Sequence, residues 1–260
     1  MLQVIVPLDF SETSFNAAQY ACNMYQKRND VNIILYHFYA GNEEVAPAEK
    51  YLNTLKNELA ELVLHIEIYA ESGDNFIDRL AAFAHVKGAY MIVMGLIGKT
   101  PLAQRFSGSN TLKMVEKNIC PVLIVPEHAK FSKVANVLIT SEMKYVQEGP
   151  VLLTVKRVLQ EFKPALHILN VDESHYIALT TAFKAERDKM EELLKEFNPE
   201  FYFMRLYDFH EAVNLFVGNK DIDIIIIAPQ YHSFYERLFK TQHTKKLIYQ
   251  SKVPVLAIHE

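Results

Sequence analysis

Residues 120–125 read Cys-Pro-Val-Leu-Ile-Val, and residues 253–258 read Val-Pro-Val-Leu-Ala-Ile, so one short aliphatic segment recurs 133 positions later in the chain. The same offset places three further aliphatic segments on partners in the second half: 4–6 on 137–139, 35–38 on 168–171, and 90–94 on 223–227. A single match of this kind means little, because β-strands resemble one another in composition. Four matches at one offset, without a net insertion, indicate a duplicated unit.

Each half alternates short aliphatic runs with stretches of helix length. The runs lie at 2–7, 31–39, 63–70, 89–94 and 121–126, and then at 134–140, 165–171, 200–206, 222–228 and 253–258. Most are nearly unbroken, which is typical of strands buried on both faces. Between them we expect helices, one capped by Ser11, one opening at 72–74 and one opening at Ser109. The pattern predicts an α/β fold of two tandem five-stranded parallel-sheet domains, 1–130 and 131–260, with right-handed crossovers.

Composition restricts the class of protein. The chain has 260 residues, of which 50% are hydrophobic and 22% charged, so a sizeable core is expected. The net charge is −4 and neither half has an excess of basic residues, so neither nucleic acid nor a membrane surface is an expected partner. Two cysteines, no basic leader and apolar runs too short to span a bilayer predict a cytoplasmic protein.

Glycine is scarce and unevenly placed. There are 8 glycines, and only Gly149 and Gly218 follow residue 130. In the first half, Gly95, Gly98 and Gly108 surround the connection after the fourth aliphatic run, with the spacing G-x2-G-x9-G-S. Glycine lets backbone approach a ligand closely, and a helix N-terminus presents free N–H groups to phosphate. Each glycine taken alone is better explained as an ordinary turn or cap, but the three together favour a phosphate-binding connection at a strand end.

Other kinds of site have weaker support. A P-loop would need a glycine at Val93, and the turn after the first strand lacks the Rossmann glycine pattern. The ten histidines show no H-E-x-x-H or other metal spacing, so no metal ligand is predicted. No G-x-S-x-G elbow surrounds Ser107 or Ser109, and no catalytic residue is predicted. We expect Cys22 and Cys120 to be small core residues rather than reactive thiols.

The glycine spacing, the start Val-Pro-Leu-Asp-Phe-Ser-Glu-Thr at 6–13 and the ending Pro-Val-Leu-Ile-Val at 121–125 resemble the universal stress protein family. The resemblance covers both halves and so suggests a tandem member. It implies a Rossmann-like, adenine nucleotide alpha hydrolase-like fold, strand order 3-2-1-4-5, and an intrachain pseudo-dimer in which the last strands pair antiparallel. In ATP-binding members the Asp after the first strand meets the adenosine, and a residue at the end of the second strand contacts adenine. The resemblance therefore implies these nucleotide-binding residues: Pro7, Asp9, Phe38, Met94, Gly95, Gly98, Gly108, Ser109, Asn110 and Thr111.

Two of these positions depart from the family pattern, and the second half departs throughout. Phe38 stands where a smaller aliphatic residue is common, and Asn110 also differs. At the offset of 133, the counterparts of Asp9 and of the motif are Glu142, Ala228, Tyr231, Thr241 and Gln242. A tyrosine side chain where the loop must approach phosphate would block it. The second domain is therefore expected to be degenerate and to have lost ATP.

Three functions remain open at this point. The first is an ATP-binding regulatory protein of the stress response, with or without Mg²⁺, whose first domain alone binds nucleotide and which signals to an unknown protein partner. The second is a nucleotide-free interaction scaffold of the same fold, because Phe38 crowds the adenine position. The third and weakest is an enzyme that hydrolyses ATP slowly, because no general base stands out. Whether the chain also forms a homodimer is left open by the sequence.

Overall fold

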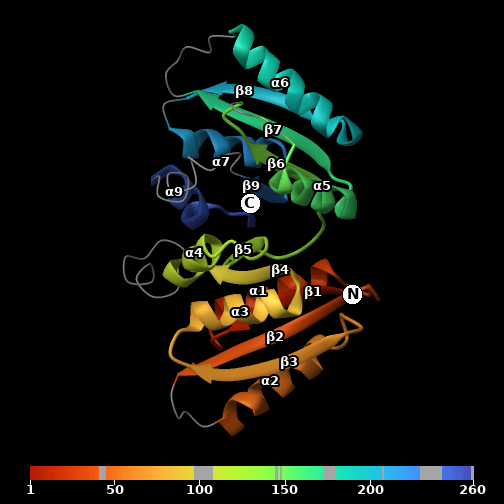
Figure 1. Ribbon diagram of the computed structural model, residues 1–260, viewed down its shortest axis with the longest axis vertical. Coiled ribbons are helices and arrows are strands. Elements are labelled where there is room, and N and C mark those ends of the chain that lie inside the picture. The colour runs from red at the N-terminus through yellow and green to blue at the C-terminus, as the bar shows by residue number, and fades with distance from the viewer. Residues whose placement is uncertain are drawn as a thin grey trace. The chain divides into compact units, whose positions relative to one another are not determined.

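The computed structural model describes residues 1–40, 45–96, 108–143, 146, 148–172, 180–206, 208–228 and 242–258. The chain divides into two compact units, Met1–Ser132 and Lys133–Glu260. The expected division after residue 130 lies two residues before this boundary. Each unit is an α/β structure with its own parallel sheet (Figure 1).

The first unit has the strand order β3-β2-β1-β4-β5, and each pair recorded between neighbouring strands is parallel. Its strands are β1 (Leu2–Leu8), β2 (Val31–Ala40), β3 (Ile66–Gly73), β4 (Ala89–Leu96) and β5 (Val122–Pro126). Its helices are α1 (Glu12–Met24), α2 (Val45–Leu59), α3 (Phe76–Lys87) and α4 (Gly108–Glu116). With right-handed crossovers, which are the general rule, this strand order puts α1 and α2 on one face of the sheet and α3 and α4 on the other.

The second unit repeats the same order as β8-β7-β6-β9-β10, again with parallel neighbours. Its strands are β6 (Asn136–Thr140), β7 (Ala165–Asp172), β8 (Glu200–Arg205), β9 (Ile224–Ile227) and β10 (Val255–Ala257). Its described helices are α5 (Pro150–Phe162), α6 (Thr181–Leu194), the 3-10 turn η2 (Lys195–Phe197), α7 (Phe209–Asn219) and α9 (Gln242–Gln250). The predicted fold class and strand order are confirmed in both units.

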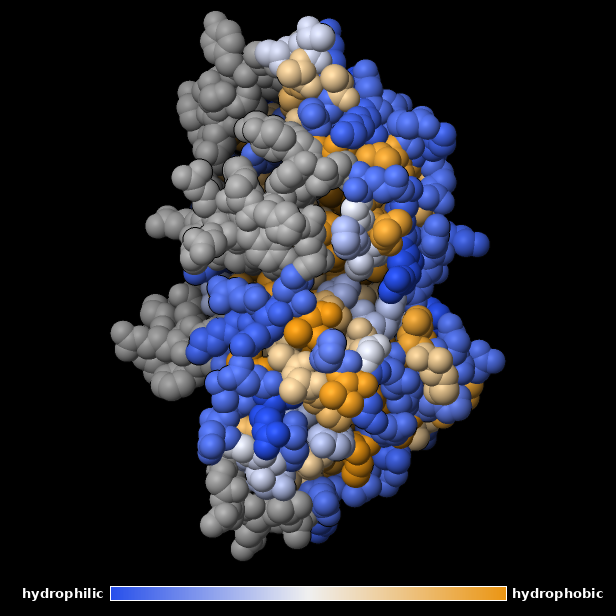
Figure 2. Space-filling model, viewed as in Figure 1, coloured by the Kyte–Doolittle hydropathy of each residue, from blue (hydrophilic) through white to orange (hydrophobic). Residues whose placement is uncertain are grey.

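The core of each unit lies where the central strands meet their helices. In β1, the run Val4–Val6 is fully buried, and so is all of Ile224–Ile227 in β9. Such strands are buried on both faces, which explains their unbroken aliphatic sequence. On the face seen in Figure 2, hydrophilic side chains predominate outside the grey regions, and apolar ones gather in small groups.

The helix starts differ in part from the sequence expectation. Ser11 caps α1 as predicted, with its side chain accepting a hydrogen bond from the Ser14 N–H at 3.2 Å. The helix expected to open at 72–74 begins later, because Gly73 is the last residue of β3 and Asn75 is the cap of α3. Strand pairing of Gly73 with Ala40 extends the sheet over residues that look like a helix start.

An aromatic cluster shows the duplication at the level of side chains. In the first unit Tyr69 stacks on Phe83, with 4.3 Å between the ring centroids. Their counterparts at the offset of 133, Tyr202 and Phe216, lie with centroids 4.8 Å apart. Two unrelated chains would have no reason to keep the same two aromatic residues at the same places on an outer strand and the following helix. The packed cluster therefore supports the repeat that the strand matches indicated.

Candidate nucleotide site

Most of the nucleotide-binding residues implied by the resemblance lie at the carboxyl edge of the first sheet. Asp9 directly follows β1, Phe38 is near the end of β2, and Gly95 is the second-last residue of β4. The helix α4 begins at Gly108, so its N-terminus lies at the same edge. In open α/β sheets this edge is where ligands bind. Gly98 lies outside the described residues.

Asp9 is an exposed acidic residue at this edge. Its Oδ1 accepts hydrogen bonds from the Ser11 N–H at 3.1 Å and from the Ser11 hydroxyl at 2.5 Å. Although loss of hydration opposes ionisation, these hydrogen bonds hold the pKa of Asp9 below its usual value. Asp9 is therefore ionised at neutral pH and has a defined orientation, as a carboxylate that accepts hydrogen bonds from ribose hydroxyls would need.

The turn after Asp9 is unusual in its backbone. Phe10 has a φ of 60°, in the left-handed region that residues other than glycine rarely adopt. Its ring stacks on the imidazole of His37 with 4.3 Å between centroids, and Tyr51 of α2 lies 5.5 Å away. The Nδ1 atom of the buried His37 lies 2.7 Å from the carbonyl oxygen of Leu8. Sequence reasoning missed His37, although it directly precedes Phe38 at the end of a strand.

Phe38 points to the opposite face of the sheet from His37, because successive side chains of a strand alternate. Its ring is half-buried and lies 5.8 Å from Phe76 at the start of α3. A Cβ added to Gly73 would come within 3.3 Å of the Phe38 ring and 3.0 Å of Arg79 Nε. Arg79 is exposed, so a cation borders the predicted adenine position. The sequence analysis did not single out Arg79, which looks like an ordinary surface residue of a helix.

Gly95 and Thr111 are brought into contact with each other. The Thr111 hydroxyl donates to the Gly95 carbonyl at 3.4 Å, and Thr111 is only 1% exposed. Gly95 also has a packing role, because a Cβ there would lie 2.3 Å from the carbonyl oxygen of Thr13 in α1. Met94 is buried in β4, and Asn110 is half-buried in the first turn of α4. Thr111 is thus directed into the protein, and Gly95 allows α1 to approach β4.

Pro7 and the start of α4 complete the predicted set. Pro7 is buried in β1 and pairs with Tyr36 of β2. Gly108 and Ser109 form the first turn of α4. The first turn of a helix has N–H groups without intrahelical partners, and these favour an anion.

The corresponding edge of the second unit keeps part of this arrangement. Met143, the counterpart of Phe10, also has a left-handed φ of 52°. The Asn170 Nδ2 donates to the Ser141 carbonyl at 2.9 Å, and these two residues are the counterparts of His37 and Leu8. The counterparts of Gly98 and Gly108, Tyr231 and Thr241, lie outside the described residues.

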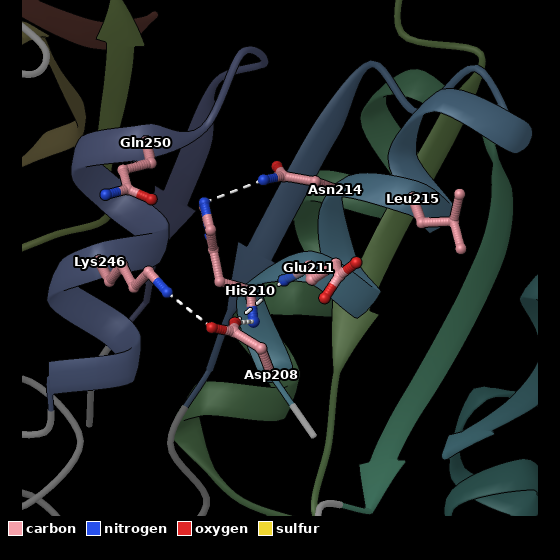
Figure 3. A pocket seen from close by; sticks show the side chains of 7 residues that line it. All are labelled: Asp208, His210, Glu211, Asn214, Leu215, Lys246 and Gln250. Atoms are coloured by element: carbon pink, nitrogen blue, oxygen red, sulfur yellow. Dashed lines mark hydrogen bonds and ion pairs between the residues drawn. The ribbon is translucent and has the colours of Figure 1, made fainter. Parts of the chain in front are cut away.

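The second unit also has an open cleft of about 490 Å³ between α7 and α9 (Figure 3). Asp208 accepts hydrogen bonds at Oδ1 from the N–H groups of His210 and Glu211, and at Oδ2 from Lys246 Nζ at 2.7 Å. The hydrogen bond from Lys246 and those from the helix backbone lower the pKa of Asp208 to about 2. Asn214 Nδ2 lies 2.9 Å from His210 Nε2, one turn away on the α7 side of the cleft. None of the residues implied by the family resemblance lines it.

The described part of the chain contains neither a metal-binding cluster nor a membrane-spanning helix. Within it, no group of three or more His, Cys, Asp or Glu side chains is arranged to hold a metal ion. No described helix is both long enough and apolar enough to cross a membrane.

Among known protein families, the model of the universal stress protein family matches residues 1–126 of this chain. A universal stress protein of Methanocaldococcus jannaschii is 27% identical over 143 residues, which is 49% of this chain and 84% of the relative. The structure of a universal stress protein from Archaeoglobus fulgidus matches with a TM-score of 0.67 and 17% identity, over 99% of this chain and 96% of that one. A putative universal stress protein from Pseudomonas aeruginosa matches with a TM-score of 0.69 and 14% identity, over 99% and 92%. At these identities the two structures establish the fold across both units.

Proposed function

The first unit belongs to the universal stress protein family, whose model matches residues 1–126, and from this premise we propose that the chain is a regulatory protein that binds ATP. The first unit alone binds the nucleotide in this proposal. ATP occupies the carboxyl edge of its sheet, and the occupied state changes the contacts of the chain with a protein partner. The glycine spacing that suggests phosphate binding is present in the first half and lost in the second.

One observation carries the proposal. The ionised carboxylate of Asp9 and the N-terminus of α4 lie at the same edge of one parallel sheet, at the ends of neighbouring strands β1 and β4. The two features suit opposite ends of a nucleotide, because a carboxylate accepts hydrogen bonds from ribose hydroxyls whereas a helix N-terminus attracts phosphate. Strands β1 and β4 are also where the strand order reverses, which is the usual ligand position in such folds.

The remaining residues have proposed roles along the same line. Phe38 offers an aromatic face to the base, with the exposed Arg79 beside it. Gly98 and Gly108 let the backbone approach the phosphates, and Ser109 adds a hydroxyl at the helix start. Pro7, Met94, Gly95, Asn110 and Thr111 shape the floor beneath the ligand. In this proposal, Mg²⁺ binds only together with the phosphates of ATP.

The proposal is tested by calorimetric titration of ATP, with and without Mg²⁺, into protein freed of nucleotide by unfolding and refolding. Gly98→Tyr introduces the side chain of its counterpart Tyr231, and should weaken ATP binding by at least about tenfold, or 1.4 kcal/mol. Gly88→Asn is the matched control, because Gly88 lies at the other edge of the sheet with a φ of 59° that asparagine tolerates. Equal affinity in wild type and Gly98→Tyr would refute the assignment.

The stoichiometry tests the claim about the first unit separately. We expect one nucleotide per chain, and a stoichiometry of two would show that the second unit also binds. A nucleotide-free scaffold is the second candidate function, favoured by the packing of Phe38 against Phe76 at the predicted adenine position. Mass spectrometry of a denatured extract of the purified protein separates the two, since copurified nucleotide would exclude the scaffold.

A further inference from the structure

The imidazole of His37 makes a directional contact with the end of β1. Its Nδ1 atom lies 2.7 Å from the carbonyl oxygen of Leu8, the residue that pairs with His37 in the parallel register. A carbonyl oxygen can only accept, so Nδ1 carries the proton in this hydrogen bond. The Leu8 carbonyl belongs to the peptide group that joins Leu8 to Asp9. The hydrogen bond therefore orients the peptide plane from which the Asp9 backbone starts.

The same imidazole also contacts the residue on the other side of Asp9. The ring of Phe10 stacks on it with 4.3 Å between centroids and 30° between the planes. Phe10 is held at a φ of 60°, a conformation that costs energy for a residue with a side chain. The stacking contact helps to stabilise that conformation, and so one buried side chain contacts both neighbours of Asp9.

The second unit makes the backbone part of this arrangement with a different residue. Asn170 replaces His37, and its Nδ2 donates to the carbonyl of Ser141, the counterpart of Leu8, at 2.9 Å. Met143 has the same left-handed backbone as Phe10. Imidazole and carboxamide differ in shape and aromaticity but share an N–H donor. The common element is thus a side-chain donor on the second strand, directed to the carbonyl at the end of the first.

We propose that His37 is the positioning residue for Asp9 in the nucleotide site. This inference rests on the proposed function and adds a residue that acts through Asp9 without touching the ligand. His37 is only 9% exposed, so its role is to orient the turn and with it the carboxylate. Both the neutral Nδ1-protonated ring and the imidazolium carry the required N–H, so the contact does not depend on the charge of the ring.

The decisive experiment compares two substitutions of nearly the same size. His37→Asn keeps a donor and copies the residue of the second unit, whereas His37→Leu removes the donor. We expect ATP affinity within about threefold of wild type for His37→Asn and roughly tenfold weaker for His37→Leu. Asn170→Leu is the control for a general loss of stability, and it should leave ATP affinity unchanged. Equal affinities for the two His37 variants would overturn the inference.

A readout without ligand keeps the inference separate from the proposed function. In ¹⁵N NMR, His37 should be protonated at Nδ1, and the amide resonances of residues 9–11 should move further in His37→Leu than in His37→Asn. If wild type binds no ATP but these shifts follow the donor, the proposed function fails and the positioning role stands. If His37 is protonated only at Nε2, or if residues 9–11 respond equally to both variants, the inference is wrong. Should His37→Leu fail to fold, the imidazole ¹⁵N spectrum of wild type still shows whether Nδ1 carries the proton, and a proton on Nε2 alone would refute the inference.

Discussion

Replacing Gly95 by alanine separates packing from ligand binding in the glycine motif. The new Cβ would lie 2.3 Å from the carbonyl oxygen of Thr13, 2.7 Å from its carbonyl carbon and 3.2 Å from the Ser14 nitrogen. Ordinary contacts of this kind begin near 3.4 Å. The helix α1 and the strand β4 must therefore separate by roughly 1 Å, and no side-chain rotation can relieve the contact because all three atoms are backbone.

The expected cost follows from this geometry. Overpacking a core typically costs about 1–3 kcal/mol, and a backbone obstacle places Gly95→Ala near or above the upper end. In urea, with a slope of about 1–3 kcal/mol per molar, a loss of about 3 kcal/mol lowers the midpoint of the first unit by roughly 1–3 M. The measurement is an equilibrium urea titration followed by circular dichroism.

The control is the same substitution where space is open. Gly218 lies near the end of α7 with no atom within 4 Å of an added Cβ. Gly218→Ala should stabilise the protein by up to about 1 kcal/mol, because alanine favours the helix. A loss below about 1 kcal/mol in Gly95→Ala, together with a large loss of ATP affinity, would show that Gly95 serves the ligand and would refute the packing argument.

Two further predictions concern titratable groups. The folded-state pKa of Asp208 is depressed to about 2 from 3.8, so its ionisation stabilises the native state above about pH 4, and that stabilisation is lost as pH falls towards 2. Asp208→Asn keeps an oxygen that can cap the helix, as Asn75 does in the first unit. This variant should lose less stability than wild type between about pH 4 and pH 2, so its acid-unfolding curve should be flatter there. An unchanged curve would contradict the pairing of Asp208 with Lys246. Burial raises the pKa of both Cys22 and Cys120 to about 12. At about pH 8 the thiols of the native protein should therefore react with iodoacetamide roughly a thousandfold more slowly than those of the unfolded protein. Rapid labelling of the native protein would show that these cysteines are accessible thiolates.

The central strands were predictable because a strand that is buried on both faces is an unbroken run of aliphatic residues in the sequence. The central strands agree with prediction to within about two residues at most ends, as β1 and β4 illustrate. The third strand shifted, from an expected 63–70 to Ile66–Gly73, because it is at the edge of the sheet and alternates polar with apolar residues. Helix starts were less certain, since Ser72 and Asn75 are both good caps and only strand pairing decides between them.

Whether an individual glycine serves packing or ligand binding could be decided only from the structure. The replacement of Gly95 by Ala228 in the second half was interpreted as loss of a nucleotide site. The packing against Thr13 offers another reason, because the helix that follows the first strand starts later in the second unit. At the offset of 133, Glu12 corresponds to residue 145, whereas α5 begins at Pro150. Val146, the counterpart of Thr13, is described as non-helical, so the helical contact that requires a glycine in β4 is not repeated at that residue.

By itself, the sequence determined the duplication and the parallel α/β fold, because periodicity and spacing are local properties that can be read without knowledge of contacts. The strand order was implied by the resemblance to the universal stress protein family and confirmed by the structure. Only the tertiary structure decided that Thr111 faces inward, that Arg79 and Phe38 both lie beside Gly73, and that His37 donates to Leu8. The two hydrogen bonds join residues 16 and 29 positions apart, and all of these contacts depend on strand register and on the direction of each side chain. The sequence pattern records which residues are buried, and the register decides which of them meet.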